Sequence, residues 1–316
     1  MTGRLIRKWA LRAAVSAAVL AVIFRFLPWD GVRQGFASLT PGVFFGVLAA
    51  FLACHVAAAA KWWLLMDRAI PFLPALRAHF GGLAANLCLP GAAGGDAVRA
   101  GLAHVALRDG PKVAAAAVGD RLIDLVGLAA LSLLGLVFLA DHSHAALAWG
   151  LAAAVTGGAA VALFVFPPLG RALATRHPGL PARGLVLRLA DSFGALARRP
   201  VLLVTALLLS MAIQSVLIGL SIRLAQPMGV AIPAAAWFFG WPIAKIIATA
   251  PVSLGGLGVR EGTLAALLSP FGADPALIVA SGLAWQGILY LAGALGALVL
   301  FASGGRLMAR SPKEAE

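Results

Sequence analysis

Long apolar runs separated by short polar segments dominate the sequence. An α-helix needs about 20 apolar residues to cross a bilayer, so each run of this length predicts a membrane-spanning helix. Six runs meet the requirement: Ala10–Leu27, Pro41–Met66, Val113–Ala140, Ala145–Phe166, Val201–Leu224 and Pro275–Ala302. The pattern predicts an all-α, polytopic membrane helical bundle with six to seven full spans.

Two further apolar regions are interrupted by Gly and Pro. Pro74–Leu107 breaks at residues 89–96, and Pro233–Leu268 breaks at residues 251–258. A broken helix leaves backbone N–H and C=O groups unpaired, and hydrocarbon offers them no partner. Such segments persist only inside protein or beside a water-filled cavity. We therefore expect two re-entrant hairpins, each entering and leaving the membrane on one side.

Residues 167–200 differ from the rest of the chain. They contain six Arg and several Pro, and Leu185–Leu196 is amphipathic. This pattern is typical of a helix that lies on a membrane surface. We expect a cytoplasmic loop that carries this surface helix, within a single integral membrane domain over residues 1–316.

The composition supports the membrane assignment. Apolar residues make up 61% and charged residues 12%, and the mean hydropathy is +0.95. In soluble domains roughly half of the residues are apolar and about a quarter are charged, so the composition of this chain excludes a soluble enzyme. Two Cys in 316 residues exclude a disulfide-built scaffold.

The net charge of +13 reflects an excess of Lys and Arg, and their distribution along the chain predicts its orientation in the membrane. If the N-terminus is cytoplasmic and both interrupted regions are hairpins, seventeen Lys and Arg lie inside and three lie outside. Cytoplasmic loops of membrane proteins carry such an excess, so both termini are predicted to be cytoplasmic. A full crossing at either interrupted region would move the later loops to the other side and weaken the bias.

The two breaks share one pattern. Pro90-x-x-x-Gly94-Gly95-x-x-Val98-Arg99 aligns without a gap with Pro251-x-x-x-Gly255-Gly256-x-x-Val259-Arg260. Chance similarity is the alternative, because Gly and Pro are common in this chain. Interrupted segments in corresponding positions of two inverted halves are typical of transporters and mark the binding site. We therefore predict an inverted repeat whose hairpins meet at a ligand.

Charged residues at membrane depth are the main candidates for that site. Each turn ends at a helix N-terminus with free N–H groups, and Arg99 or Arg260 follows one turn later, which favours an anion such as phosphate. A charge at the bilayer centre costs at least ~2.5 kcal/mol, so such residues are paired or functional. Four acidic residues lie outside the predicted loops, surface helix and tail: Asp96, Asp120, Asp124 and Glu261.

Several of these residues allow two interpretations. Arg121 either pairs with Asp124 within one helix or reaches across to a carboxylate or headgroup in a cavity. Asp96 either lines the predicted ligand site or caps the helix that carries Arg99. Lys61 is expected to be an interface anchor, and His55 is expected to hydrogen-bond to a neighbouring helix.

Arg260 and Glu261 pose a related question. Adjacent helical residues point about 100° apart, so we expect each to need a separate partner. Lys245, in the other arm of the hairpin, is the candidate partner for Glu261. Alternatively, Glu261 caps its own helix and Arg260 extends to the interface.

These segments resemble the lysylphosphatidylglycerol synthase transmembrane region, a family of flippase-like integral membrane proteins. The resemblance runs from about residue 10 to 303 and is carried by residues 90–99, 120–125 and 251–262. It implies movement of a lipid between leaflets of the bacterial inner membrane. The lipid is an aminoacylated phospholipid in two-domain synthases, and a hopanoid or polyprenyl-linked glycolipid is implied for stand-alone relatives. This sequence ends at Glu316 without an aminoacyltransferase domain, so we expect no synthase activity.

We predict transbilayer movement of a polar-headed or anionic lipid, with a lipid-synthesis enzyme as the candidate protein partner. We expect no catalytic residue, no metal or other cofactor, and no nucleic acid. One alternative is a membrane-embedded lipid-modifying transferase, because Asp120-x-x-x-Asp124 is similar to part of a phosphotransferase metal motif. The other is a scaffold of a lipid-synthesis complex. The expected headgroup-binding residues are Gly94, Gly95, Asp96, Arg99, Arg121, Asp124, Ser253, Gly255, Gly256, Arg260 and Glu261, with Asp120 and Lys245 as gating or charge-pairing residues.

The predicted topology can be tested by labelling single cysteines in a background where both native cysteines are Ala. Cysteines at Asp109 and Leu180 should react with a membrane-impermeant reagent only from the cytoplasm. Cysteines at His142 and Gln226 should react only from outside. Cytoplasmic labelling at His142 would overturn the first hairpin, because the side of every later loop depends on it.

Overall fold

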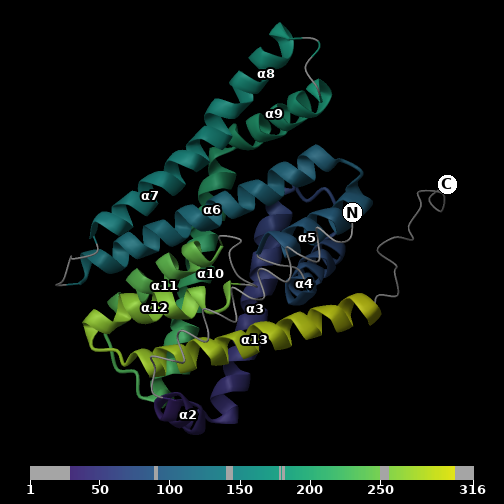
Figure 1. Ribbon diagram of the computed structural model, residues 1–316. Coiled ribbons are helices and arrows are strands. Elements are labelled where there is room, and N and C mark those ends of the chain that lie inside the picture. Colours follow the sequence, from purple (N-terminus) through teal and green to yellow (C-terminus); the bar gives the residue numbers. More distant parts are fainter. Residues whose placement is uncertain are drawn as a thin grey trace, which may run out of the picture.

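The described part of the chain is helical, with no strand among its residues (Figure 1). A computed structural model describes residues 29–88, 92–139, 145–177, 179, 182–249 and 256–302. The predicted span Ala10–Leu27 and both breaks at their Pro residues lie outside these ranges. The helices are α2 (Trp29–Ser38), α3 (Pro41–Leu65), α4 (Phe72–Cys88), α5 (Ala92–Leu107), α6 (Gly110–Val137), α7 (Ala145–Ala160), α8 (Phe166–Arg176), α9 (Arg183–Ala197), α10 (Pro200–Ala225), α11 (Ala234–Ala248), α12 (Val259–Leu268) and α13 (Pro275–Ala302).

The structure confirms an all-α, polytopic membrane fold. Among the described residues, four helical stretches are long and apolar enough to cross a membrane. They are Pro41–Leu65, Ala145–Arg176, Pro200–Met228 and Pro275–Ala302, and each contains most or all of a predicted span. Helix α6 covers most of a fifth predicted span with 28 residues, but it carries four charged side chains.

Proline and capping side chains set where the long helices begin. Helices α3, α6 and α10 each have Pro in the first turn, where the missing N–H costs no helical hydrogen bond. Thr40 Oγ1 accepts from the Val43 N–H at 3.4 Å, and Asp109 Oδ1 accepts from the Lys112 N–H at 3.1 Å. These caps satisfy N–H groups that the first turn leaves free.

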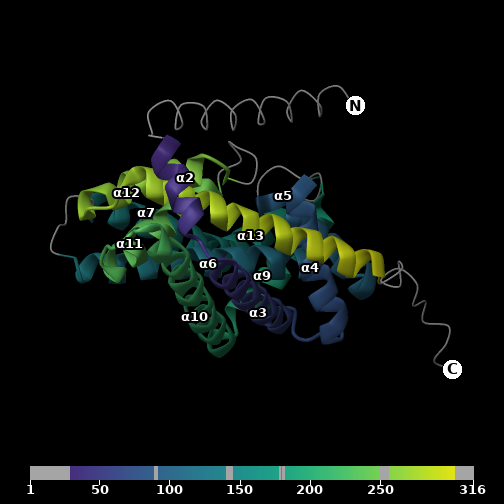
Figure 2. The same cartoon turned by 90° about the horizontal axis from the view of Figure 1, so that it is seen from below.

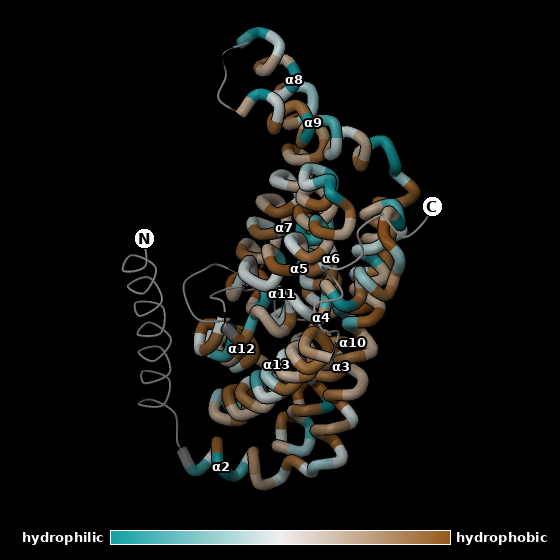
Figure 3. Tube along the Cα trace, turned by 90° about the vertical axis from the view of Figure 1, so that its right-hand side faces the viewer, coloured by the Kyte–Doolittle hydropathy of each residue, from teal (hydrophilic) through white to brown (hydrophobic). Residues whose placement is uncertain are grey.

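The segment 167–200 is more helical than the loop that we predicted. Helix α8 continues α7 through a π-helical turn, Val161–Val165, and Pro167 and Pro168 lie in the first turn of α8 instead of ending the helix. Helix α9 covers the predicted amphipathic stretch and packs against α8, while its place on a membrane surface stays a prediction. The α8–α9 pair and α2 lie at opposite ends of the molecule, and hydrophilic residues are frequent at both (Figure 3).

Helices α3 and α10 pack together, and a pair of shorter helices lies on either side of them (Figures 1 and 2). The pairs α4–α5 and α11–α12 contain the two interrupted regions. Helix α4 packs on α13, whereas α11 packs on α6. Each pair thus packs against a long helix of the other half of the chain. Re-entry into the membrane by either pair stays a prediction.

Two glycines allow each of these pairs to pack closely on a long helix of the other half. A Cβ atom at Gly135 of α6 would lie 2.4 Å from the Phe239 nitrogen of α11. A Cβ atom at Gly296 of α13 would lie 2.3 Å from the Phe80 oxygen of α4. The separation of Gly135 and Gly296 in the sequence is the one that separates Gly95 from Gly256. This coincidence supports the repeat, while its inverted orientation in the membrane stays a prediction.

An exposed ion pair connects two loops that the charge pattern puts on one side. Arg199 donates to both oxygens of Asp67, at 2.6 and 3.2 Å. These hydrogen bonds from Arg199 lower the pKa of Asp67. The segment after α3 and the segment before α10 therefore lie on the same face of the molecule, in agreement with the predicted topology.

The close helix crossings at Gly135 and Gly296 predict how a change from Gly to Ala affects stability at each position. Gly135→Ala and Gly296→Ala should each lower the free energy of unfolding in detergent by about 1–3 kcal/mol, because a methyl group would push two backbones apart. Gly219→Ala in α10 is the control, since nothing lies within 4 Å of its added Cβ. It should be neutral or stabilising by up to about 1 kcal/mol. Equal effects at all three positions would contradict the role of the crossings.

Candidate functional site

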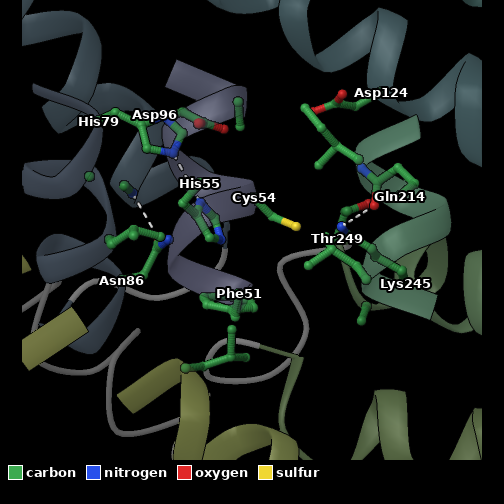
Figure 4. Close-up of a pocket in the computed structure, with 18 of the residues that line it drawn as sticks. Phe51, Cys54, His55, His79, Asn86, Asp96, Asp124, Gln214, Lys245 and Thr249 are labelled. Carbon is green, nitrogen blue, oxygen red and sulfur yellow. Dashed lines mark hydrogen bonds between the residues drawn. The ribbon is translucent and has the colours of Figure 1, made fainter. Parts of the chain in front are cut away.

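A cavity of about 270 Å³ lies among the helices, and both interrupted regions contribute to its wall (Figure 4). Helices α4 and α5 supply His79, Asn86 and Asp96, and helices α11 and α12 supply Lys245 and Arg260. Helices α3, α6, α10 and α13 also contribute to the wall. The apolar residues of the whole wall include Phe51, Leu83, Leu87, Ile213, Leu217, Trp241, Trp285 and Leu289.

Asp120 lies at the centre of a buried charge network. Its carboxylate is 3.1 Å from Lys61 Nζ and 3.0 Å from Arg99 Nη1, so it links α6 to α3 and α5. Lys61 also forms a hydrogen bond and ion pair with Asp124. Only 1% of Lys61 is exposed, so the prediction of an interface anchor is wrong. The two carboxylates hold the Lys61 ammonium inside the protein.

Arg121 and Asp96 extend the network between α5 and α6. Arg121 pairs with Asp96 on α5, so it reaches across to another helix and does not pair with Asp124. Asp96 also lies 3.3 Å from Arg99 Nη2. Helix α5 begins at Ala92, and Asp96 lies one turn inside it. The capping interpretation of Asp96 is therefore wrong, because its carboxylate binds arginines.

Two histidines join the network through Arg99. His55 Nδ1 is 3.0 Å from His79 Nε2, which confirms the predicted bond from His55 to a neighbouring helix. Arg99 Nη1 lies 3.5 Å from His79 Nδ1. Because a guanidinium only donates, His79 Nδ1 accepts, and its Nε2–H donates to His55 Nδ1. Each ring then has one accepting nitrogen, so both histidines are neutral.

Arg260 and Glu261 bind each other directly, so the prediction of separate partners is wrong. Glu261 Oε2 accepts from the Gly258 N–H at 2.7 Å and caps α12. This turn back toward the helix start brings its other oxygen to the Arg260 guanidinium. Arg260 Nη2 also donates to Gln286 Oε1 at 3.2 Å and to the Gly282 carbonyl at 3.3 Å. Glu261 is 0% exposed.

Lys245 does not pair with Glu261, so that prediction is also wrong. Its Nζ donates to Gln214 Oε1 at 2.8 Å and lies 4.9 Å from the centre of the Trp241 ring. Within the described residues, no carboxylate lies within 4.0 Å of Lys245 Nζ. Lys245 therefore lacks the acidic partner that every other cation of the cavity wall has.

Glycines at the two breaks allow backbone contacts and a backbone angle that a side chain would disturb. The Gly95 N–H donates to Asn86 Oδ1 at 3.1 Å, and a Cβ at Gly95 would lie 2.4 Å from the Gly82 oxygen. Gly256 has φ of +79°, which favours glycine. Eight of the predicted headgroup-binding and charge-pairing residues lie in the cavity wall: Gly95, Asp96, Arg99, Asp120, Arg121, Asp124, Lys245 and Arg260. Gly94, Gly256 and Glu261 do not line the cavity. Ser253 and Gly255 lie outside the described residues.

Sequence reasoning missed several polar residues of the wall. Gln214 and Gln286 are each the one amide side chain in a long apolar helix. That isolation is a usable signal, because an amide inside a membrane helix needs a hydrogen-bond partner. His79 and Asn86 lie in a less apolar stretch and carry no such signal.

The fold and the cavity together define a multi-pass helical membrane protein with a charged internal site. The chain belongs to the family described as "Lysylphosphatidylglycerol synthase TM region", which it matches over residues 9–296. This match confirms the resemblance. No curated protein and no solved structure matches the chain.

The charge network makes Asp120 a critical residue for stability. Asp120→Asn should lower the free energy of unfolding by about 3–5 kcal/mol, because it leaves Lys61 and Arg99 buried with too little negative charge. Asp191→Asn is the control, since it removes the exposed partner of Arg171 and should cost at most about 1 kcal/mol. Denaturation in detergent followed by circular dichroism measures both.

A double variant separates pairing from packing in this network. Lys61→Met combined with Asp120→Asn should cost less than the sum of the two single changes, because the pair is removed as a unit. Additive losses, or an Asp120→Asn variant as stable as Asp191→Asn, would contradict the network.

Proposed function

We propose that this protein moves a polar-headed lipid between the two leaflets of the bacterial inner membrane, with both termini in the cytoplasm. The observation that carries the proposal is the charged cavity, to which both interrupted regions contribute. A membrane protein that only crosses the bilayer has no need for Lys61, Arg99 and Asp120 inside its helical core. Intramembrane charges of this kind mark substrate or ion pathways.

The cavity offers a headgroup what hydrocarbon cannot. A polar or charged group that leaves water loses several kcal/mol unless hydrogen bonds and opposite charges replace its hydration (roughly 2–7 kcal/mol for a neutral polar group). Asn86, Gln214 and the paired charges provide such contacts along the wall. Leu83, Leu87 and other apolar residues accompany them, so the site suits a molecule that is both polar and apolar.

The contacts of Lys61 favour transport over the transferase alternative. A metal-dependent transferase would need Asp120 and Asp124 to share a metal ion. The Lys61 ammonium instead bonds to both carboxylates. In the described residues, no group of three or more His, Cys, Asp or Glu side chains is arranged to hold a metal. The membrane lipid itself is the proposed partner, with no nucleic acid and no cofactor.

Reconstitution tests the proposal. Vesicles should contain the purified protein and a phospholipid with a fluorescent acyl chain in both leaflets, so that the headgroup stays native. Dithionite bleaches only the outer leaflet. We expect about half of the signal to be lost in protein-free vesicles and nearly all of it in proteoliposomes.

A matched pair of variants in α3 provides the control. Ala58 lines the cavity, whereas Ala53 is exposed on the outside of the same helix. Ala58→Trp should reduce lipid movement to the rate of protein-free vesicles, and Ala53→Trp should leave it unchanged. A new lipid species by mass spectrometry would favour the transferase. The absence of both movement and product would favour a scaffold.

A further inference from the structure

The charges around the cavity do not balance. Both histidines are neutral, as their hydrogen bonds require, so only the basic and acidic side chains count. The wall holds one more cation than the carboxylates that serve it. The cations are Lys61, Arg99, Arg121, Lys245 and Arg260, and the carboxylates are Asp96, Asp120, Asp124 and Glu261.

The excess charge has a definite location. Asp96 is shared by two arginines, and Asp120 is shared by Lys61 and Arg99. Asp124 accepts from Lys61 and from Ser210 Oγ, the latter at 2.5 Å. Among the described residues, Lys245 contacts neutral groups alone, namely the Gln214 amide and the Trp241 ring. The net positive charge of the cavity therefore lies at Lys245.

The surroundings of Lys245 suit an anion. Its Nζ has three N–H groups, of which one is donated to Gln214 Oε1. That bond leaves the Gln214 amide nitrogen as a second donor beside the ammonium, with no protein partner in the described part of the chain. Figure 4 shows Gln214, Lys245 and Thr249 together on one side of the cavity, across from His55 and Asn86.

We infer that Lys245 and Gln214 form the anchor for a singly charged phosphodiester on the transported lipid. This inference rests on the proposed function and narrows its substrate class. A phosphodiester carries one negative charge, which matches the one uncompensated cation. Charge-assisted hydrogen bonds to phosphate oxygens are among the strong ones in proteins. An uncharged lipid would leave Lys245 without a counter-charge at membrane depth, which is costly.

Equilibrium binding to the purified protein tests the anchor. The probes are tail-fluorescent phosphatidylglycerol and diacylglycerol with the same chains, followed by fluorescence anisotropy. The wild type should bind phosphatidylglycerol more tightly than diacylglycerol, and added salt should weaken only the former. Lys245→Met should weaken phosphatidylglycerol binding by about ten- to a hundredfold and leave diacylglycerol binding unchanged. Lys245→Arg should retain most of the affinity.

Lys112→Met is the matched control, because it removes the same charge outside the cavity wall. It should leave both affinities unchanged. Equal binding of the two lipids by the wild type, or equal losses in Lys245→Met and Lys112→Met, would overturn the anchor. Competition by soluble glycerophosphoglycerol as strong as that by the lipid would assign the site to a soluble anion instead.

The two proposals fail in different ways. Movement of fluorescent lipid without any preference for phosphatidylglycerol would overturn the anchor and leave the proposed function standing. Binding of phosphatidylglycerol that depends on Lys245, without lipid movement in vesicles, would overturn the proposed function and leave the anchor standing.

Discussion

A charged side chain inside hydrocarbon needs an opposite charge, a hydrogen bond or water, and the core of this protein is organised by that need. Lys61, which comes from a long apolar helix, can be buried only because two carboxylates of α6 surround it. Arg99 in turn binds one of these carboxylates from α5. Three helices are thereby held in one arrangement, and the polar groups that result form one side of the cavity.

Backbone contact is the second constraint on the architecture. One interrupted helical pair packs on α13 and the other on α6, each a long helix of the other half, so neither half encloses the cavity alone. Such close crossings require residues without a side chain, and Gly135 and Gly296 occupy them. The same glycines that permit this packing therefore also bring the Asp96 side and the Lys245 side of the cavity to face each other.

The acidic partners divide the cavity into two kinds of surface. On the side of α5 and α6, each cation has a carboxylate, so this surface is polar and close to neutral. On the side of α10 and α11, Lys245 has only an amide and an aromatic ring. The cavity thus has one localised positive charge, at Lys245, instead of a uniformly charged wall.

The sequence by itself determined the membrane class, most of the helices, both interrupted regions and eight residues of the cavity wall. Apolar length, glycine placement and charge at membrane depth are local properties, so the order of residues is enough to reveal them. The partners of the charges were decided only in three dimensions. Lys61 was expected at the interface and Lys245 beside Glu261, because side-chain reach between neighbouring segments is all that a sequence offers. The fold instead brings Lys61 to carboxylates on α6 and Lys245 to Gln214, and a long-range contact of this kind depends on helix packing, which no local pattern specifies.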